Sequence, residues 1–110
     1  MREESSLLSH HLSFDRATLA AFCRRWKIRR LEVFGSVLRE DFGPDSDIDL
    51  LVTFQHDAEW SLFDHLRMTS EIAVILGRDV DLVSRRAVER SHNWIRRRAI
   101  LDSSRPFYEA

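Results

Sequence analysis

Two aspartates, one residue apart, introduce an apolar run near the middle of the chain. Asp47 and Asp49 belong to the stretch D-I-D-L-L-V. Asp81 belongs to a similar stretch, D-V-D-L-V-S, in which it holds the position that Asp49 holds in the first. Alternate residues of a strand point to the same face, so Asp47 and Asp49 should project together while Ile48 and Leu50 point into the core. Neighbouring carboxylates repel each other unless a cation lies between them. Hard oxygen ligands, without histidine or cysteine, favour Mg²⁺ whose coordination is completed by substrate phosphates.

A glycine and a serine lie a short distance upstream. Gly35-Ser36 follows residues 31–34, L-E-V-F, whose alternation is typical of a short strand. A glycine at a strand end lets the backbone approach a ligand closely, and a serine that opens a helix offers its hydroxyl and N–H groups to an anion. If the strands of Asp49 and Asp81 are neighbours, the three aspartates can build a two-metal site with ions about 3.5–4 Å apart. This combination predicts a nucleoside triphosphate site.

Each motif also has a purely structural interpretation. Gly-Ser alone is usually a turn, and Asp-x-Asp alone can cap a loop or form surface salt bridges. Asp79 is expected to be a solvated strand-end residue, because Asp81 lies deeper in the same strand. The order of the motifs favours a functional site: strand, Gly-Ser, a spacer of residues 37–46, Asp-x-Asp on a strand, helix, and a strand aspartate.

Helices and strands that would position these residues follow from periodicity and capping. Asp15 is a plausible N-cap for a helix that ends near Lys27, and Ser61 with Asp64 forms a capping box for a helix that ends before Gly77. Further helices are expected at 85–90 and 94–101, and a short helical turn at 37–40. Residues 42–46 are expected to form a turn. The expected strands are 31–34, 47–54 and 80–83. We therefore predict an α/β (α+β) fold, with helices packed on a small mixed sheet.

Composition limits the classes of protein that remain. The 110 residues are 44% hydrophobic and 32% charged with a net charge of −1, which indicates a globular domain and neither a membrane nor a nucleic-acid partner. We expect residues 1–12 to be weakly ordered and 13–110 to form a single domain. The lone Cys23 fits a reducing cytoplasm, and the sequence has neither a signal peptide nor an apolar run of about 18 residues. Arginines concentrate in the C-terminal third.

The stretch G-S-V-L-R-E-D-F-G-P-D-S-D-I-D-L-L-V resembles the signature of the polymerase-β-like nucleotidyltransferase superfamily. The closest resemblance is to minimal nucleotidyltransferases (MNT proteins), the antitoxin partners of HEPN ribonuclease toxins. Glu40 departs from the family pattern, which often has glycine after the arginine, and this affects the expected shape of the loop. The resemblance implies a nucleotidyltransferase fold, with ATP as substrate and two Mg²⁺ ions.

The resemblance also implies roles for individual residues. Asp47 and Asp49 would hold both metals, and Asp81 would bind the ion that activates the acceptor and could take its proton. Gly35 and Ser36 would bind the β- and γ-phosphates. Arg39 could reach a phosphate or instead pair with a neighbouring acidic residue.

In MNT systems this chemistry transfers AMP from ATP to a tyrosine of the HEPN toxin and silences it, within a complex that we expect to be oligomeric. The short chain leaves no room for an acceptor domain, so the acceptor should come on a partner. Two alternatives remain open: a non-catalytic antitoxin that occludes its toxin, and a small-molecule nucleotidyltransferase.

Overall fold

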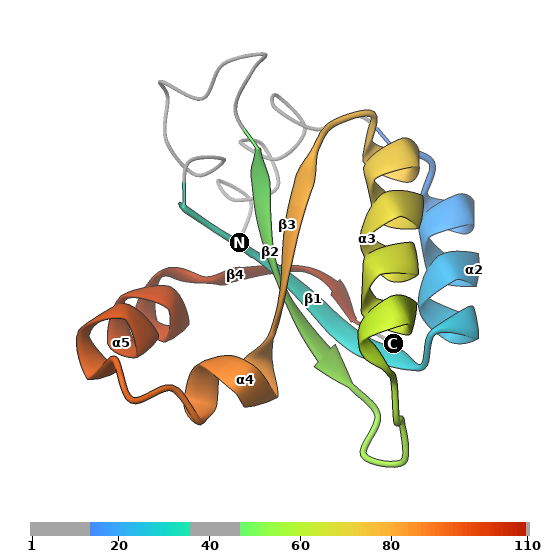
Figure 1. Ribbon diagram of the computed structural model, residues 1–110. Helices are drawn as coiled ribbons and strands as arrows, with labels where there is room; N and C mark the ends of the chain where they lie inside the picture. Colours follow the sequence, from blue (N-terminus) through green and yellow to red (C-terminus); the bar gives the residue numbers. More distant parts are fainter. Residues whose placement is uncertain (1–13, 36–46, 110) are drawn as a thin grey trace.

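The computed structural model describes residues 14–35 and 47–109 and contains a four-stranded mixed sheet with helices on both faces (Figure 1). The strands are β1 Ile28–Phe34, β2 Ile48–Phe54, β3 Val80–Ser84 and β4 Arg105–Glu109. The helices are α2 Arg16–Arg25, α3 Leu62–Leu76, α4 Arg85–Glu89 and α5 Trp94–Ser103. The sheet order is β3-β2-β1-β4, in which β2 and β3 are parallel and the other pairs are antiparallel. The predicted fold class is confirmed.

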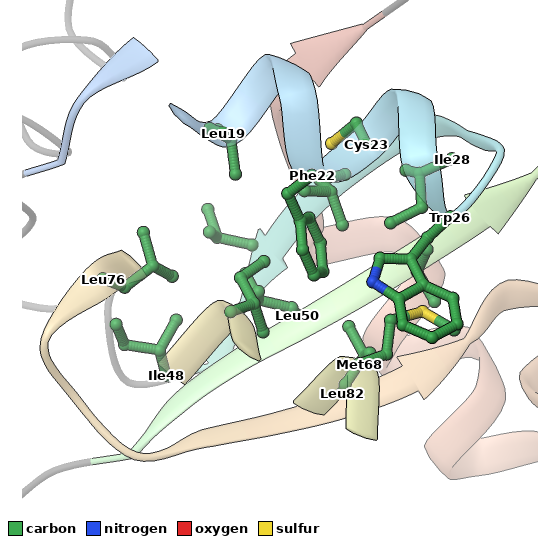
Figure 2. Close-up of a cluster of buried hydrophobic side chains, with 14 residues drawn as sticks. Leu19, Phe22, Cys23, Trp26, Ile28, Ile48, Leu50, Met68, Leu76 and Leu82 are labelled. Atoms are coloured by element: carbon green, nitrogen blue, oxygen red, sulfur yellow. The ribbon is translucent and has the colours of Figure 1, made fainter. Parts of the chain in front are cut away.

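Helices α2 and α3 lie side by side on one face of the sheet (Figure 1). The carboxylate of Asp15 accepts a hydrogen bond of 3.0 Å from the N–H of Thr18 and so caps α2. Ser61 and Asp64 form the predicted capping box of α3, and Gly77 ends that helix at φ 68°. The apolar sides of both helices close over the sheet and form the main core. This core, shown in Figure 2, consists of Leu19, Phe22, Cys23, Trp26, Ile28, Leu31, Val33, Ile48, Leu50, Val52, Met68, Ile72, Leu76 and Leu82.

Helices α4 and α5 pack on the opposite face through a smaller cluster made of Phe34, Leu51, Val88 and Ile100. Beside this cluster the carboxylate of Glu32 in β1 is only 3% exposed. Its Oε1 lies 3.0 Å from Nη2 of Arg85 in α4, and its Oε2 accepts a hydrogen bond of 3.1 Å from the hydroxyl of Ser104, the C-cap of α5. Glu32 therefore ties both helices to the sheet.

Two strands differ from the prediction. β1 begins at Ile28, three residues earlier than expected, because Lys27 turns the chain at φ 55° and the side chain of Ile28 enters the core. β4 was not predicted at all. It contains Pro106, which cannot donate to a sheet ladder, and such residues are tolerated at an edge, where β4 pairs with β1.

Some predictions fall outside the described residues: the weak order of 1–12, the helical turn at 37–40 and the turn at 42–46. Among the helices of 14–35 and 47–109, none combines the length and the apolar character needed to cross a bilayer.

Candidate active site

Asp47 and Asp49 lie at the start of β2, as the sequence predicts. Asp47 directly precedes the strand and is exposed, whereas Asp49 is its second residue and is half-buried. Ile48 and Leu50 point to the other face and are completely buried in the main core. The buried neighbours hold the strand in register, so the two carboxylates face away from α2 and α3.

The third predicted aspartate comes from the neighbouring strand. β2 and β3 are parallel, and Asp49 is the register partner of Asp81. Partners in a parallel pair point to the same face, and adjacent strands lie about 4.8 Å apart. The exposed Asp81 therefore shares a face with Asp49. The two strands are therefore neighbours, which was the condition for a site that contains all three aspartates.

Gly35 completes this end of the sheet from a third strand. Phe34, the last residue of β1, pairs with Asp49, so Gly35 follows directly beside that carboxylate. Gly35 has φ 74°, and a Cβ added there would overlap Oδ2 of Asp49. The sequence suggested that this glycine makes room for a ligand. The structure gives it another role that sequence reasoning missed, which is to make room for the carboxylate itself.

The remaining predicted site residues, Ser36 and Arg39, lie outside the described residues. Within 14–35 and 47–109, no three His, Cys, Asp or Glu side chains are arranged as a ready metal-binding cluster. Like charges that share one face repel each other, so a spread arrangement is expected for these carboxylates without a cation. The donor set, all carboxylate oxygens from adjacent strands, nevertheless fits a hard cation such as Mg²⁺.

The chain matches the family model described as "Nucleotidyltransferase domain" over residues 16–106, and it therefore belongs to this family. It is 34% identical over 65 residues to the protein adenylyltransferase MntA of Thermococcus cleftensis, an alignment that covers 59% of this chain and 64% of that protein. The matched segment spans 59–64% of the length of the curated relatives to which the chain is similar.

Solved structures support the same fold. A structure assigned as a minimal nucleotidyltransferase superimposes with a TM-score of 0.63 at 33% identity, covering 94% of both chains. A toxin–antitoxin structure with AMP-PNP gives a TM-score of 0.64 at 20% identity and covers 86% of this chain and 73% of that one. A tri-AMPylated Shewanella oneidensis HEPN toxin in complex with an MNT antitoxin gives 0.56 at 20% identity, with coverages of 86% and 69%. The predicted nucleotidyltransferase fold is confirmed.

Proposed function

We propose that this chain transfers AMP from ATP to a tyrosine hydroxyl of a cognate HEPN toxin and thereby neutralises it. The observation that carries the proposal is the register pairing of Asp49 with Asp81 beside Gly35, in a chain of the nucleotidyltransferase domain family. The named activity of the Thermococcus relative and the tri-AMPylated toxin in the Shewanella complex support a protein as acceptor.

Different residues of the chain would bind the metal ions and the phosphates. Asp47, Asp49 and Asp81 would hold two Mg²⁺ ions, which when bound neutralise phosphate charge and lower the cost of deprotonating the acceptor. Gly35, with Ser36 and Arg39, would bind the β- and γ-phosphates. These contacts keep the leaving group in line with the attacking oxygen.

Asp81 would accept the proton of the acceptor, since it is exposed and lies on an outer strand of the described sheet. A tyrosine hydroxyl has a pKa of about 10 in solution, so its attack at neutral pH requires such help. Its oxygen forms a bond to the α-phosphorus while the bond to the bridging oxygen of pyrophosphate breaks.

Mass spectrometry of the toxin tests the proposal. After incubation with this chain, ATP and Mg²⁺, the intact toxin should gain the mass of one or more adenylyl groups and lose its RNase activity. The Asp47→Asn/Asp49→Asn double variant should abolish both effects. Asp79→Asn is a matched control, because Asp79 is an exposed carboxylate directly before the strand of Asp81 and is expected to have no role.

A second function, inhibition by occlusion alone, is favoured by apolar side chains that remain exposed at the start of α3. Leu62, Phe63 and Leu66 are 74%, 84% and 55% exposed, as is typical of a surface that contacts another protein. An inhibited toxin of unchanged mass would establish this reading and refute transfer. An adenylylated aminoglycoside in the same assay would instead point to a small-molecule acceptor.

A further inference from the structure

A pocket of about 400 Å³ opens at the end of the sheet opposite the aspartates. Its lining residues come mainly from the ends of β2 and β3, the connection from β2 to α3 and the start of α4. These segments lie at the lower end of the sheet in Figure 1. Val52 and Thr53 line it three and four positions along β2 from Asp49, which corresponds to about 10–13 Å at 3.3 Å per residue. The pocket is therefore separate from the proposed transfer site.

The walls of the pocket are predominantly cationic. Arg29, Arg85 and Arg86 line it, and Glu89 is the acidic residue among the described lining groups. Glu89 is already paired with Arg85 at 3.4 Å, and Arg85 also binds Glu32. Within the described part of the chain, no carboxylate pairs with the guanidinium groups of Arg29 or Arg86. An anion could thus engage two arginines without breaking an existing ion pair.

The remaining lining includes aromatic residues. Thr53 also lines the pocket, but its hydroxyl is buried and does not face a ligand. Trp60 donates from Nε1 to the carbonyl of Trp26 at 3.0 Å, so its polar atom is satisfied, and its ring lines the pocket together with Phe54. A few polar groups beside aromatic surface, in a volume above about 300 Å³, are typical of small-ligand sites.

We propose that this pocket binds a small phosphorylated ligand with a flat ring, of the class of nucleoside monophosphates. Arg29 and Arg86 would hold the phosphate, because a guanidinium group matches two phosphate oxygens at once. Phe54 and Trp60 would contact the ring. This site could not be predicted from the sequence, because Arg29 and Arg86 come from separate elements, β1 and α4, with no recognisable spacing.

The test is a titration with AMP in EDTA, without toxin, followed by NMR of the histidine rings and by calorimetry. His56 and His65 line the pocket and should shift in a saturable manner, whereas His92, which is not among the lining residues, should not. Adenosine alone and inorganic phosphate alone should bind more weakly, since each supplies half of the contacts. Arg29→Gln/Arg86→Gln should weaken AMP binding about tenfold or more.

Two control variants locate the binding. Arg96→Gln/Arg98→Gln removes the same charge from exposed positions of α5 and should leave the affinity unchanged. Asp47→Asn/Asp49→Asn should also bind AMP normally. If Arg29→Gln/Arg86→Gln fails to fold, the single Arg86→Gln exchange at an exposed position serves instead.

Three results would overturn the proposal: no saturable binding of AMP, an equal loss in the α5 control, or loss of binding in the aspartate variant. Because the titration contains neither Mg²⁺ nor toxin, its failure would leave the proposed AMP transfer untouched.

Discussion

At the scale of single residues, the site depends on a glycine as much as on its carboxylates. Gly35 and Gly77 both have positive φ, 74° and 68°, but their surroundings differ. An added Cβ at Gly35 would overlap the carboxylate of Asp49, whereas one at Gly77 would meet no heavy atom within 4 Å. Substitution of Gly77 should therefore report backbone strain alone, whereas substitution of Gly35 should report strain together with crowding of Asp49.

We predict that Gly35→Ala costs more stability than Gly77→Ala. The left-handed backbone costs about 1–2 kcal/mol for alanine at either position, and Gly35→Ala must in addition displace Asp49. Urea unfolding of both variants measures the difference, and Gly35→Ala should also lose AMP transfer while Gly77→Ala retains it. Equal losses of stability together with unimpaired transfer by Gly35→Ala would contradict this role.

Cys23 provides a second prediction at this scale. Burial raises the pKa of its thiol from 9.0 to about 12, because the charged thiolate is poorly solvated in the core. The folded state thus favours the thiol. The stability this contributes is fully present below pH 9 and is lost as the pH rises toward about 12. Relative to Cys23→Ala, the wild type should lose stability more steeply above pH 9, as measured by urea unfolding. If the stabilities of the wild type and Cys23→Ala changed with pH in parallel, the raised pKa of the Cys23 thiol would be contradicted.

At the scale of elements, α4 and the end of α5 depend on a single buried carboxylate. Burial lowers the pKa of Arg85, but hydrogen bonds and attraction from Glu32 and then Glu89 outweigh this effect and raise the pKa above its ordinary value. Arg85 therefore remains charged and binds both acids. Glu32 is buried at 3% exposure, whereas Glu89 is exposed.

We predict that Glu32→Gln destabilises the fold by about 1–3 kcal/mol, since it leaves the guanidinium group of Arg85 without its buried counter-charge. Glu89→Gln removes an exposed partner of the same arginine and should cost about 0.5 kcal/mol or less. Thermal unfolding of both variants provides the comparison. Similar midpoints for the two would show that the buried pair contributes no more than the exposed one.

A helix or strand could be predicted from the sequence where its capping residues or apolar pattern lie within a few neighbouring residues. The capped helices, the strand that contains Asp49 and the strand that contains Asp81 carry their signals within a few residues. All of these elements were predicted from the sequence. β4 carries Pro106 and has no alternation, so only its pairing with β1 makes it a strand. The sequence likewise could not show that Gly35 touches Asp49, because that contact depends on the pairing of β1 with β2.

At the scale of the whole molecule, charges of opposite sign collect at the two ends of the sheet. Asp47, Asp49 and Asp81 lie at the end where β2 and β3 begin, and Arg29 and Arg86 line the pocket where these strands finish. The three carboxylates repel one another, and a bound cation reduces this repulsion. Stability should therefore depend on Mg²⁺ in a way that is specific to the aspartates.

We predict that Mg²⁺ raises the unfolding midpoint of the wild type, and that Asp47→Asn/Asp49→Asn is the more stable protein in EDTA but gains nothing from Mg²⁺. At ten times its dissociation constant, a cation that binds the folded state alone stabilises it by about 1.4 kcal/mol. In a domain of this size, each kcal/mol shifts the unfolding midpoint by roughly 4–8 °C. Scanning calorimetry with NaCl at matched ionic strength separates binding from screening. An equal rise in the double variant would mean that the cation binds elsewhere, and the aspartates would then lose their proposed role as metal ligands.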